Sequence, residues 1–249
     1  FELDPEILGH AVWVAGLYSF IRDFDMAEKY YRTAIQTFPE NTMAYSFLSD
    51  MKKYAYGDLD GAGKILKDGM LNVDKPGLLV IHRFRLAMDL REFDDALKLM
   101  QEEYEGVSPS LYKGIALSYL GREEEMTVEL ERSLTNLNAK LITYPEVAYL
   151  YDKIGLAHAF LGHKAEAIVA GKMALEIEPV SKHALNGPDH LENLASIYAV
   201  LGEGDLALDI VDDLLSYPNN FTRWTLKLNP FFYNLRDLPR YQKLVGELS

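Results

Sequence analysis

The chain has 249 residues, of which 49% are apolar and 25% charged, and this composition is that of a globular protein of one or two domains. Its formal net charge of −13, with 25 Lys and Arg residues scattered along the chain, disfavours nucleic-acid binding because phosphates require a basic patch. The absence of cysteine excludes disulfides, thiolate metal sites and cysteine nucleophiles, and no apolar run reaches the roughly 18 residues of a membrane span.

Six turns of similar sequence recur along the chain, each between two segments with apolar residues at helical spacing. In chain order they are RDFDMA ending at Ala27, GDLDGA at Ala62, REFDDA at Ala96, GREEEM at Met126, GHKAEA at Ala167 and GEGDLA at Ala207. Their spacings are 35, 34, 30, 41 and 40 residues. We therefore predict about six helix pairs over 8–220, with small residues where the helices of a pair touch, and a C-terminal cap over 221–249.

Small residues, an aromatic residue and a proline recur at fixed places in these units. The first unit has Ala15, Tyr18, Ala27, Ala34 and Pro39, the fifth has Gly155, Ala167, Ala174 and Pro179, and the sixth has Leu194, Ala195, Tyr198 and Ala207. This pattern resembles the tetratricopeptide repeat (TPR) over almost the whole chain, although Gly69, Met126 and His158 depart from it. The resemblance implies an all-α solenoid, in which helix-turn-helix pairs stack into a right-handed superhelix that ends in a capping helix near 237–247.

The first residues, FELDPE, read like the end of a repeat. Counting back from the first unit places Pro5 where Pro39 and Pro179 end later units. We therefore expect residues 1–7 to be the tail of a preceding repeat in a fragment of a larger protein; a native start after processing is the alternative. In a fragment, a helix over about 8–21 exposes apolar side chains, through which the chain is expected to associate with a second copy or bind its own tail.

The resemblance also implies a concave groove lined by the first helix of each pair, the A helix. The positions that usually face this groove are Trp13, Phe20, His82, Arg85, Tyr112, Tyr149, Asp152, Lys153, Glu192, Asn193 and Ser196. Aromatic side chains supply contact area at a low entropic cost, and the Arg and Lys residues are expected to bind carboxylates. The alternative is that several of these residues only pack between A helices. The clamp with which some TPR domains bind chaperone tails is not expected, because its positions are occupied here by Val12, Gly16, Leu78 and His82.

The sequence contains no motif for catalysis, for a metal or for a cofactor. None of the histidines forms an H-E-x-x-H motif, and His158 and His163 are five residues apart, a spacing that does not place them on one helix face. His183 and His190 flank an insertion at 181–190, where a histidine is most simply a solvated loop residue. We therefore predict a protein that is not an enzyme and uses neither metal nor cofactor. The alternative is a sensor that binds a small molecule or short peptide in the groove or in the insertion.

The C-terminal third resembles the C-terminal repeats of large bacterial regulatory and signalling proteins, in which the array follows a winged-helix activator, a Ser/Thr protein kinase or a nucleotide cyclase. The matching residues are Pro179, Val180, Ser181, Lys182, Gly187 and Pro188, followed by Leu228, Pro230, Leu235, Arg236, Pro239 and Arg240. In the closing stretch, aromatic residues are expected to cover the sixth helix pair and arginines to reach its carbonyl or acidic groups; these residues are Phe231, Phe232, Tyr233, Arg236 and Arg240. A peptide-binding site in the same stretch is the alternative.

These observations predict a protein–protein interaction module of a regulatory protein. Its partner is expected to be a protein or peptide segment, or an effector domain of the same polypeptide. Neither nucleic acid nor membrane is expected to bind to this segment. The expected compartment is the cytoplasm, with the periplasm as the alternative for a membrane-anchored regulator.

Overall fold

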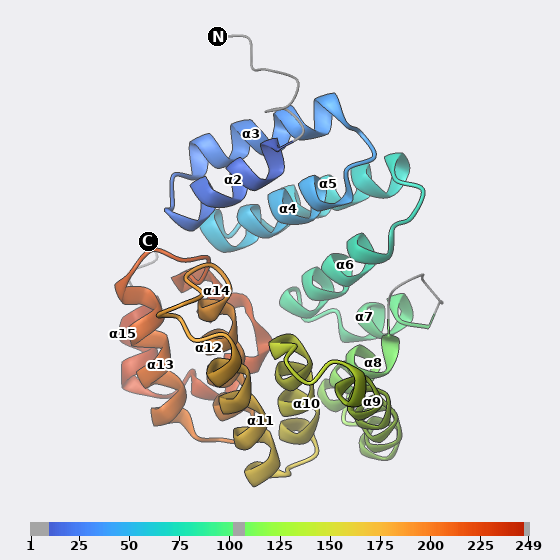
Figure 1. Cartoon of the computed structure of the whole chain (residues 1–249), viewed down its shortest axis with the longest axis vertical. Helices are drawn as coiled ribbons and strands as arrows, with labels where there is room; N and C mark the ends of the chain where they lie inside the picture. The colour runs from blue at the N-terminus through green and yellow to red at the C-terminus, as the bar shows by residue number, and fades with distance from the viewer. Residues whose placement is uncertain (1–9, 102–107, 247–249) are drawn as a thin grey trace.

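The computed structural model describes residues 10–101 and 108–246, and within these ranges it contains helices and no strand. Twelve of the helices form six consecutive pairs (Figure 1). The pairs are α2 (Ala11–Phe20) with α3 (Phe24–Thr37), α4 (Thr42–Tyr56) with α5 (Leu59–Asn72), α6 (Gly77–Asp89) with α7 (Phe93–Leu99), α8 (Pro109–Tyr119) with α9 (Glu123–Thr143), α10 (Ala148–Phe160) with α11 (Lys164–Ile177), and α12 (Gly187–Val200) with α13 (Gly204–Ser216). The two helices of each pair contact each other and the next pair, so the predicted all-α solenoid of helix pairs is confirmed.

The turn inside each pair has one residue in the left-handed conformation. These residues are Arg22, Gly57, Arg91, Gly121, Gly162 and Gly202, with φ between 63° and 80°. Each is the first residue of one of the six recurring sequence turns. Glycine adopts this conformation without strain, whereas an L-residue is disfavoured by about 1 kcal/mol or more. The two arginines therefore need compensating contacts.

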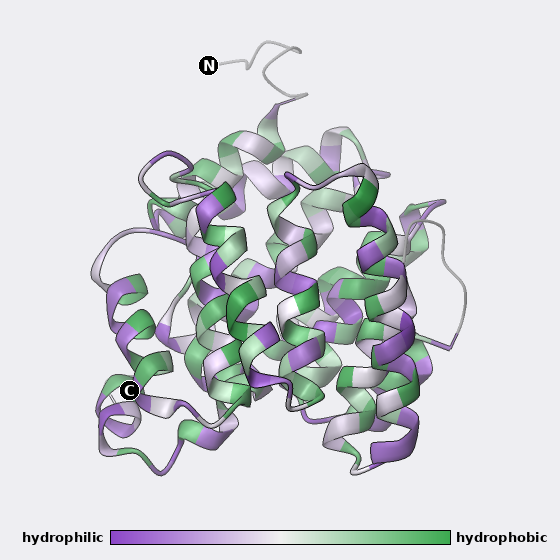
Figure 2. Cartoon of the chain, turned by 60° about the horizontal axis from the view of Figure 1, so that its bottom comes forward, coloured by the Kyte–Doolittle hydropathy of each residue, from purple (hydrophilic) through white to green (hydrophobic). Residues whose placement is uncertain are grey.

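Small residues fill the contact between the helices of a pair, as the sequence predicts. Ala27, Ala62, Ala96, Ala167 and Ala207 are fully buried, which allows the paired helices to approach closely. Figure 2 shows that hydrophobic and hydrophilic residues are mixed along every helix, as expected for helices that bury one face.

The departure from the repeat pattern at Gly69 has a steric reason. A Cβ at this position would lie 2.9 Å from Cγ of Tyr45 and 3.0 Å from Cδ1 of Leu79. Both neighbours are buried, so neither has room to move away. Glycine is therefore needed in α5 because Tyr45 occupies the space that an alanine side chain would fill.

Three short helices follow the sixth pair: α14 (Arg223–Leu228), the 3₁₀ helix η1 (Pro230–Leu235) and α15 (Pro239–Val245). Phe232, Leu235 and Tyr241 are buried in one cluster with residues of α12 and α13. Arg240 binds Asp212 and Asp209 of α13, with donor–acceptor distances of 2.8 Å from Nε and 2.6 Å from Nη1. The C-terminal helices therefore cap the sixth pair.

One residue of the cap contacts more than one helix pair. Phe231 packs against a cluster that contains Ile197 of the sixth pair, as expected, and its ring also lies edge-on to Phe160 of α10, with 5.6 Å between ring centroids. The neighbouring Tyr233 ring lies 5.8 Å from the guanidinium carbon of Arg91, in the turn of the third pair. The expectation for the cap is therefore extended: η1 packs on α12 of the sixth pair and also reaches the third and fifth pairs.

The chain also closes on its own beginning, through residues 217–224, which we call the closing segment. The guanidinium of Arg22 donates to the backbone carbonyls of Tyr217 at 3.3 Å, Asn219 at 3.5 Å and Phe221 at 3.0 Å. The Thr222 hydroxyl donates to the carbonyl oxygen of Tyr54, and α14 packs against α4 (Figure 1). The closing segment therefore contacts the first and second helix pairs. As a result, the A helices lie around a common interior (Figure 1).

Candidate functional site

The A helices α4, α6, α8, α10 and α12 bring charged and phenolic groups to this interior, and we call their shared surface the inner face. Arg85 of α6 interacts electrostatically with groups on three other A helices, among them Asp50, Tyr112 and Glu192. Burial opposes the charge of Arg85, but the attraction of these groups outweighs burial and raises its pKa. Its Nη1 lies 3.9 Å from Oδ2 of Asp50, while 52% of the side chain is exposed. Arg85 therefore stands in the middle of the inner face and is accessible there.

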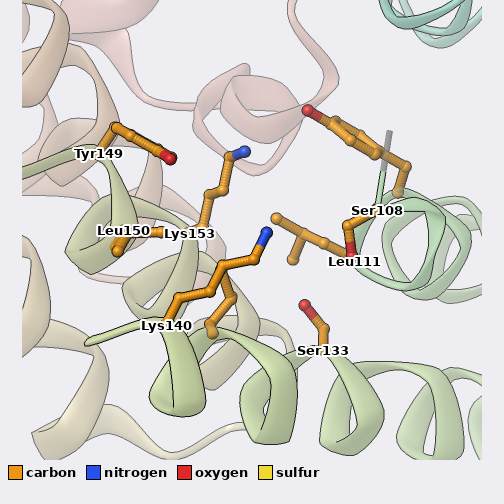
Figure 3. Close-up of a pocket in the computed structure, with 9 residues that line it drawn as sticks. Ser108, Leu111, Ser133, Lys140, Tyr149, Leu150 and Lys153 are labelled. Carbon is orange, nitrogen blue, oxygen red and sulfur yellow. The ribbon is translucent and has the colours of Figure 1, made fainter. Parts of the chain in front are cut away.

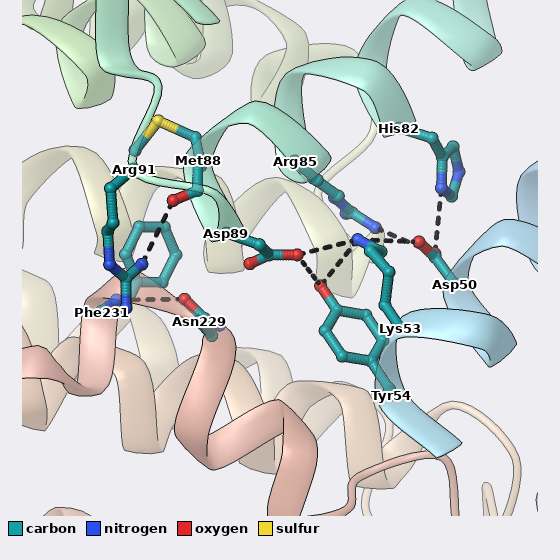
Figure 4. Close-up of polar contacts among 10 residues, drawn as sticks. All are labelled: Asp50, Lys53, Tyr54, His82, Arg85, Met88, Asp89, Arg91, Asn229 and Phe231. Carbon is teal, nitrogen blue, oxygen red and sulfur yellow. Dashed lines mark hydrogen bonds and ion pairs between the residues drawn. The ribbon is translucent and has the colours of Figure 1, made fainter. Parts of the chain in front are cut away.

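A fully buried lysine joins the second and third helix pairs. Nζ of Lys53 lies 3.0 Å from Oδ2 of Asp89 and 3.2 Å from Oδ1 of Asp50, and it donates to the Tyr54 hydroxyl at 3.1 Å (Figure 4). The second oxygen of Asp50 lies 2.9 Å from Nδ1 of His82. Burial opposes the charge of Lys53, yet the neighbouring Tyr54 and the two carboxylates raise its pKa. Because protein groups surround this ammonium, the cluster holds two repeats together rather than binding a ligand.

The histidine at the end of the insertion 181–190 is not a solvated loop residue. His190 is buried within α12, where Nδ1 lies 2.6 Å from Oδ2 of Asp152 on α10 and Nε2 lies 3.4 Å from Oε2 of Glu178. Burial lowers the pKa of His190, but the bonds to Asp152 and Glu178 outweigh burial and raise it. The interpretation as a loop histidine was wrong for this residue, because its partner Asp152 is 38 residues away and gives no local signal. His183 is exposed, as expected.

The predicted groove residues differ in how accessible they are. The buried ones are His82, Asp152 and Ser196; the partly buried ones are Phe20, Tyr112, Lys153, Glu192 and Asn193; the exposed ones are Trp13, Arg85 and Tyr149. His82 is paired with Asp50 and Asp152 with His190, so these two predicted groove residues hold neighbouring A helices together. Trp13 belongs, with Leu17 and the C-cap residue Ile21, to an exposed apolar stripe along α2 and its C-terminal end.

A small cavity opens on the inner face between α8, α9 and α10. It has a volume of about 100 Å³, and its lining includes Lys140, Lys153, Tyr112, Tyr149 and Ser133. Figure 3 shows both lysine ammonium groups pointing into the same space. Sequence analysis missed Lys140, because it lies on the second helix of its pair; the unusual length of α9, 21 residues, carries it to the mouth of the cavity.

The charges at this cavity repel each other. Burial lowers the pKa of Lys153; Tyr149 opposes this effect, and Lys140 and Arg85 add to it by repulsion. Nζ of Lys153 lies 5.1 Å from the centre of the Tyr149 ring, a cation–π distance. Three cations from α6, α9 and α10 therefore act on one small region of the inner face.

The described part of the chain shows no arrangement typical of a metal centre. Within residues 10–101 and 108–246, no group of three or more His, Asp or Glu residues is placed to hold a metal ion. His158 and His163 do not share a helix, yet the turn at Gly162 brings their Nδ1 atoms to 3.2 Å. A pair of exposed histidines offers too few ligands for the usual tetrahedral site. Over the same residues, no helix has the length and hydropathy needed to cross a membrane.

No family model matches the chain, and no curated protein matches it. Among solved structures, the chain is similar to PilW, a type IV pilus biogenesis factor, at 14% identity over 97% of this chain and 100% of that chain, with a TM-score of 0.49. It is also similar to a tetratricopeptide repeat protein from Parabacteroides merdae, at 13% identity over 97% and 90% of the two chains, with a TM-score of 0.43. A third is the TPR2AB domain of yeast Sti1 in its pHSP90 complex, at 15% identity over 94% and 100%, with a TM-score of 0.42.

Proposed function

We propose that the chain is a non-enzymatic interaction module that holds a segment of a partner protein against its inner face. The observation that carries this proposal is the group formed by Tyr149, Lys153 and Arg85 on two A helices. Tyr149 and Arg85 are each 52% exposed, although they belong to helices that face the interior. Exposed tyrosine and arginine side chains on a recessed surface are typical of the residues that dominate binding energy in protein interfaces.

The sensor alternative has less support in the insertion 181–190. Asn186 already donates to Glu178 at 3.1 Å, and His190 is bonded to Asp152 and Glu178. Asn186 and His190 are therefore already bonded to neighbouring side chains, while His183 is exposed. We further propose that the module belongs to a cytoplasmic regulatory protein, on the resemblance of its C-terminal third alone.

A selection of displayed peptides tests the proposal. The full chain is immobilised, a random peptide library is panned against it, and the affinity of the enriched peptides is measured by calorimetry. We expect Tyr149→Ala to weaken binding by about thirtyfold, which corresponds to about 2 kcal/mol for an interface aromatic residue. The helical content and melting temperature should hardly change, because the side chain is exposed.

Two variants on outward helices serve as controls. Leu71→Ala removes an exposed apolar side chain of α5, and Lys172→Ala removes an exposed charge of α11. Both should retain the affinity of the parent chain. Enriched peptides that lose affinity with these variants, and not with Tyr149→Ala, would place recognition on the outer face and contradict the proposal.

A further inference from the structure

The cavity between α8, α9 and α10 has room for a polar group rather than for a large apolar ligand. Its volume is about 100 Å³, whereas a single water molecule requires about 10–15 Å³ of such space. Four hydroxyl-bearing residues, Ser108, Tyr112, Ser133 and Tyr149, line it beside the two lysines. The floor is apolar, because Leu111, Leu137 and Leu150 are buried. The cavity therefore fits a compact group of several heavy atoms with hydrogen-bond acceptors on its outside.

The two lysines in this cavity form no ion pair with any carboxylate of the described residues, although Asp152 attracts Lys153 from a greater distance. Within the residues that the structure describes, neither Lys140 nor Lys153 has a carboxylate within ion-pairing distance. The nearest candidate in sequence, Asp152, points to His190 at 2.6 Å instead. Arg85 adds a third positive charge from α6. Among the described residues that line the cavity, the charged ones are the two lysines, in a chain whose net charge is −13.

We propose that this cavity is a binding site for a single anionic group, a phosphoryl or carboxylate group on a side chain of the bound partner segment. Lys140 and Lys153 supply the charge, and the four hydroxyl groups supply hydrogen bonds to the remaining oxygens. Charge-assisted hydrogen bonds from two ammonium groups favour an anion with several acceptor oxygens. This inference rests on the proposed function, because it names the part of the partner segment that the inner face recognises.

Three blocked tripeptides, Gly-Xaa-Gly with phosphoserine, glutamate or glutamine at the centre, test the proposal together with inorganic phosphate. Each is titrated into the full chain carrying labelled lysines, and the side-chain NMR signals of Lys140 and Lys153 are followed. We expect phosphate and the two anionic tripeptides to shift both signals, and the glutamine tripeptide to shift neither. Phosphoserine should bind more tightly than glutamate because it offers more acceptor oxygens and charge.

Matched lysine variants separate this site from general attraction of anions. Lys140→Gln and Lys153→Gln should each weaken phosphoserine binding at least tenfold, Lys153→Arg should restore most of it, and Lys172→Gln on α11 should leave it unchanged. Equal shifts of all exposed lysines, or equal losses with Lys172→Gln, would overturn the proposal. Shifts with inorganic phosphate but with neither anionic tripeptide would overturn the peptide-borne source and leave a site for small ions.

The outcomes also separate this proposal from the proposed function. If selected peptides bind in a manner that depends on Tyr149 but not on either lysine, the inner face recognises peptides and the anion site is wrong. If the anionic tripeptides shift both lysine signals while no selected peptide depends on Tyr149, the anion site stands and the broader function is wrong.

Discussion

Two adjacent lysines of α4 have different surroundings although they follow each other in the sequence. Lys52 is 17% exposed and pairs with Glu28 of α3 at 2.7 Å, whereas Lys53 is fully buried between the carboxylates of Asp89 and Asp50. No sequence signal distinguishes them, because burial of Lys53 depends on the packing of α6 against α4. The two residues provide a matched pair for measuring what burial adds to an ion pair.

Lys53→Ala should lower the free energy of unfolding by about 3–5 kcal/mol, because it leaves Asp89 and Asp50 without their common buried counter-charge. Lys52→Ala should lower it by about 1 kcal/mol or less, since its partner stays in contact with water. Urea denaturation of both variants measures the difference. Equal losses would mean that the buried cluster contributes no more than a surface pair.

Two titrating groups of α12 make stability depend on pH in the same direction. The pKa of His190 is raised by Asp152 against the effect of burial, so its stabilising contribution is complete below about pH 6.5 and is lost as the pH rises through the folded-state pKa. Burial, together with Asp189, raises the pKa of Glu192 from 4.5 to about 8, against the attraction of Arg85. Between about pH 4.5 and pH 8, the folded chain therefore keeps a proton on Glu192 that the unfolded chain releases. The free energy of unfolding falls as the pH rises through this range.

The melting temperature should therefore be lower at pH 8.5 than at pH 5.5. One pKa unit corresponds to about 1.4 kcal/mol, which in a chain of this size lowers the melting temperature by about 3–6 °C. Glu192→Gln should reduce the fall, because the amide does not titrate. Calorimetry at several pH values measures both chains; a parent melting temperature that rises with pH, or an unchanged slope in the variant, would contradict this assignment.

At the scale of helices and turns, the closing segment is held by a residue with an unfavourable backbone conformation. Arg22 has φ of 63°, where glycine stands in four of the other turns, and its guanidinium donates to three carbonyls of the closing segment. The hydrogen bonds compensate the strain of the left-handed turn. Arg91 has the same conformation, with φ of 66°, and donates to the carbonyl of Met88 at 3.2 Å.

Arg22→Gly shows which of these two opposing effects is larger. It removes the backbone strain, worth about 1 kcal/mol, and also the charged hydrogen bonds, worth about 1.5–3 kcal/mol each. We expect a net loss of about 2 kcal/mol or more, with faster hydrogen exchange of the Phe221 amide in the closing segment. Arg32→Ala, which removes an exposed arginine of α3, should leave exchange there unchanged. A stabilised Arg22→Gly chain with unchanged exchange would show that the closing contact contributes little.

The helix pairs were predictable from the sequence, while the closing contact was not. Each pair carries its own local signals: the turn, the alanine at the helix contact and the apolar periodicity. The closing contact joins residues 195 to 199 positions apart, and its acceptors are backbone carbonyls, which every residue possesses. Tyr149 and Lys153 could be identified from their positions in the repeat. Lys140 could not, because its place depends on the length of α9 and not on a local sequence signal.

In the molecule as a whole, α2, the first helix of the described residues, presents an apolar surface to its surroundings. Trp13 and Leu17 of α2 and Ile21 directly after it are 64%, 53% and 59% exposed and lie four residues apart. This spacing places them on one helix face. The predicted exposure of apolar side chains on this helix is confirmed. Association through this surface stays a prediction.

A second copy of the chain is the partner that we expect for this stripe. Sedimentation of the parent chain should show association that increases with concentration, and Leu17→Glu should weaken it at least tenfold by placing a charge in the contact. Leu71→Glu, which changes an exposed leucine of α5, is the matched control and should associate like the parent. A parent chain that stays monomeric at high concentration would contradict this prediction.

Lysine footprinting shows whether a partner segment binds the inner face. Exposed lysines of the full chain are acetylated with and without an enriched peptide from the selection above, and modification is quantified by mass spectrometry. We predict that the peptide protects Lys140 and Lys153 and leaves Lys172 on α11 and Lys182 in the insertion as reactive as before. Protection of Lys172 or Lys182, with Lys140 and Lys153 still fully reactive, would place binding outside the inner face and contradict the account.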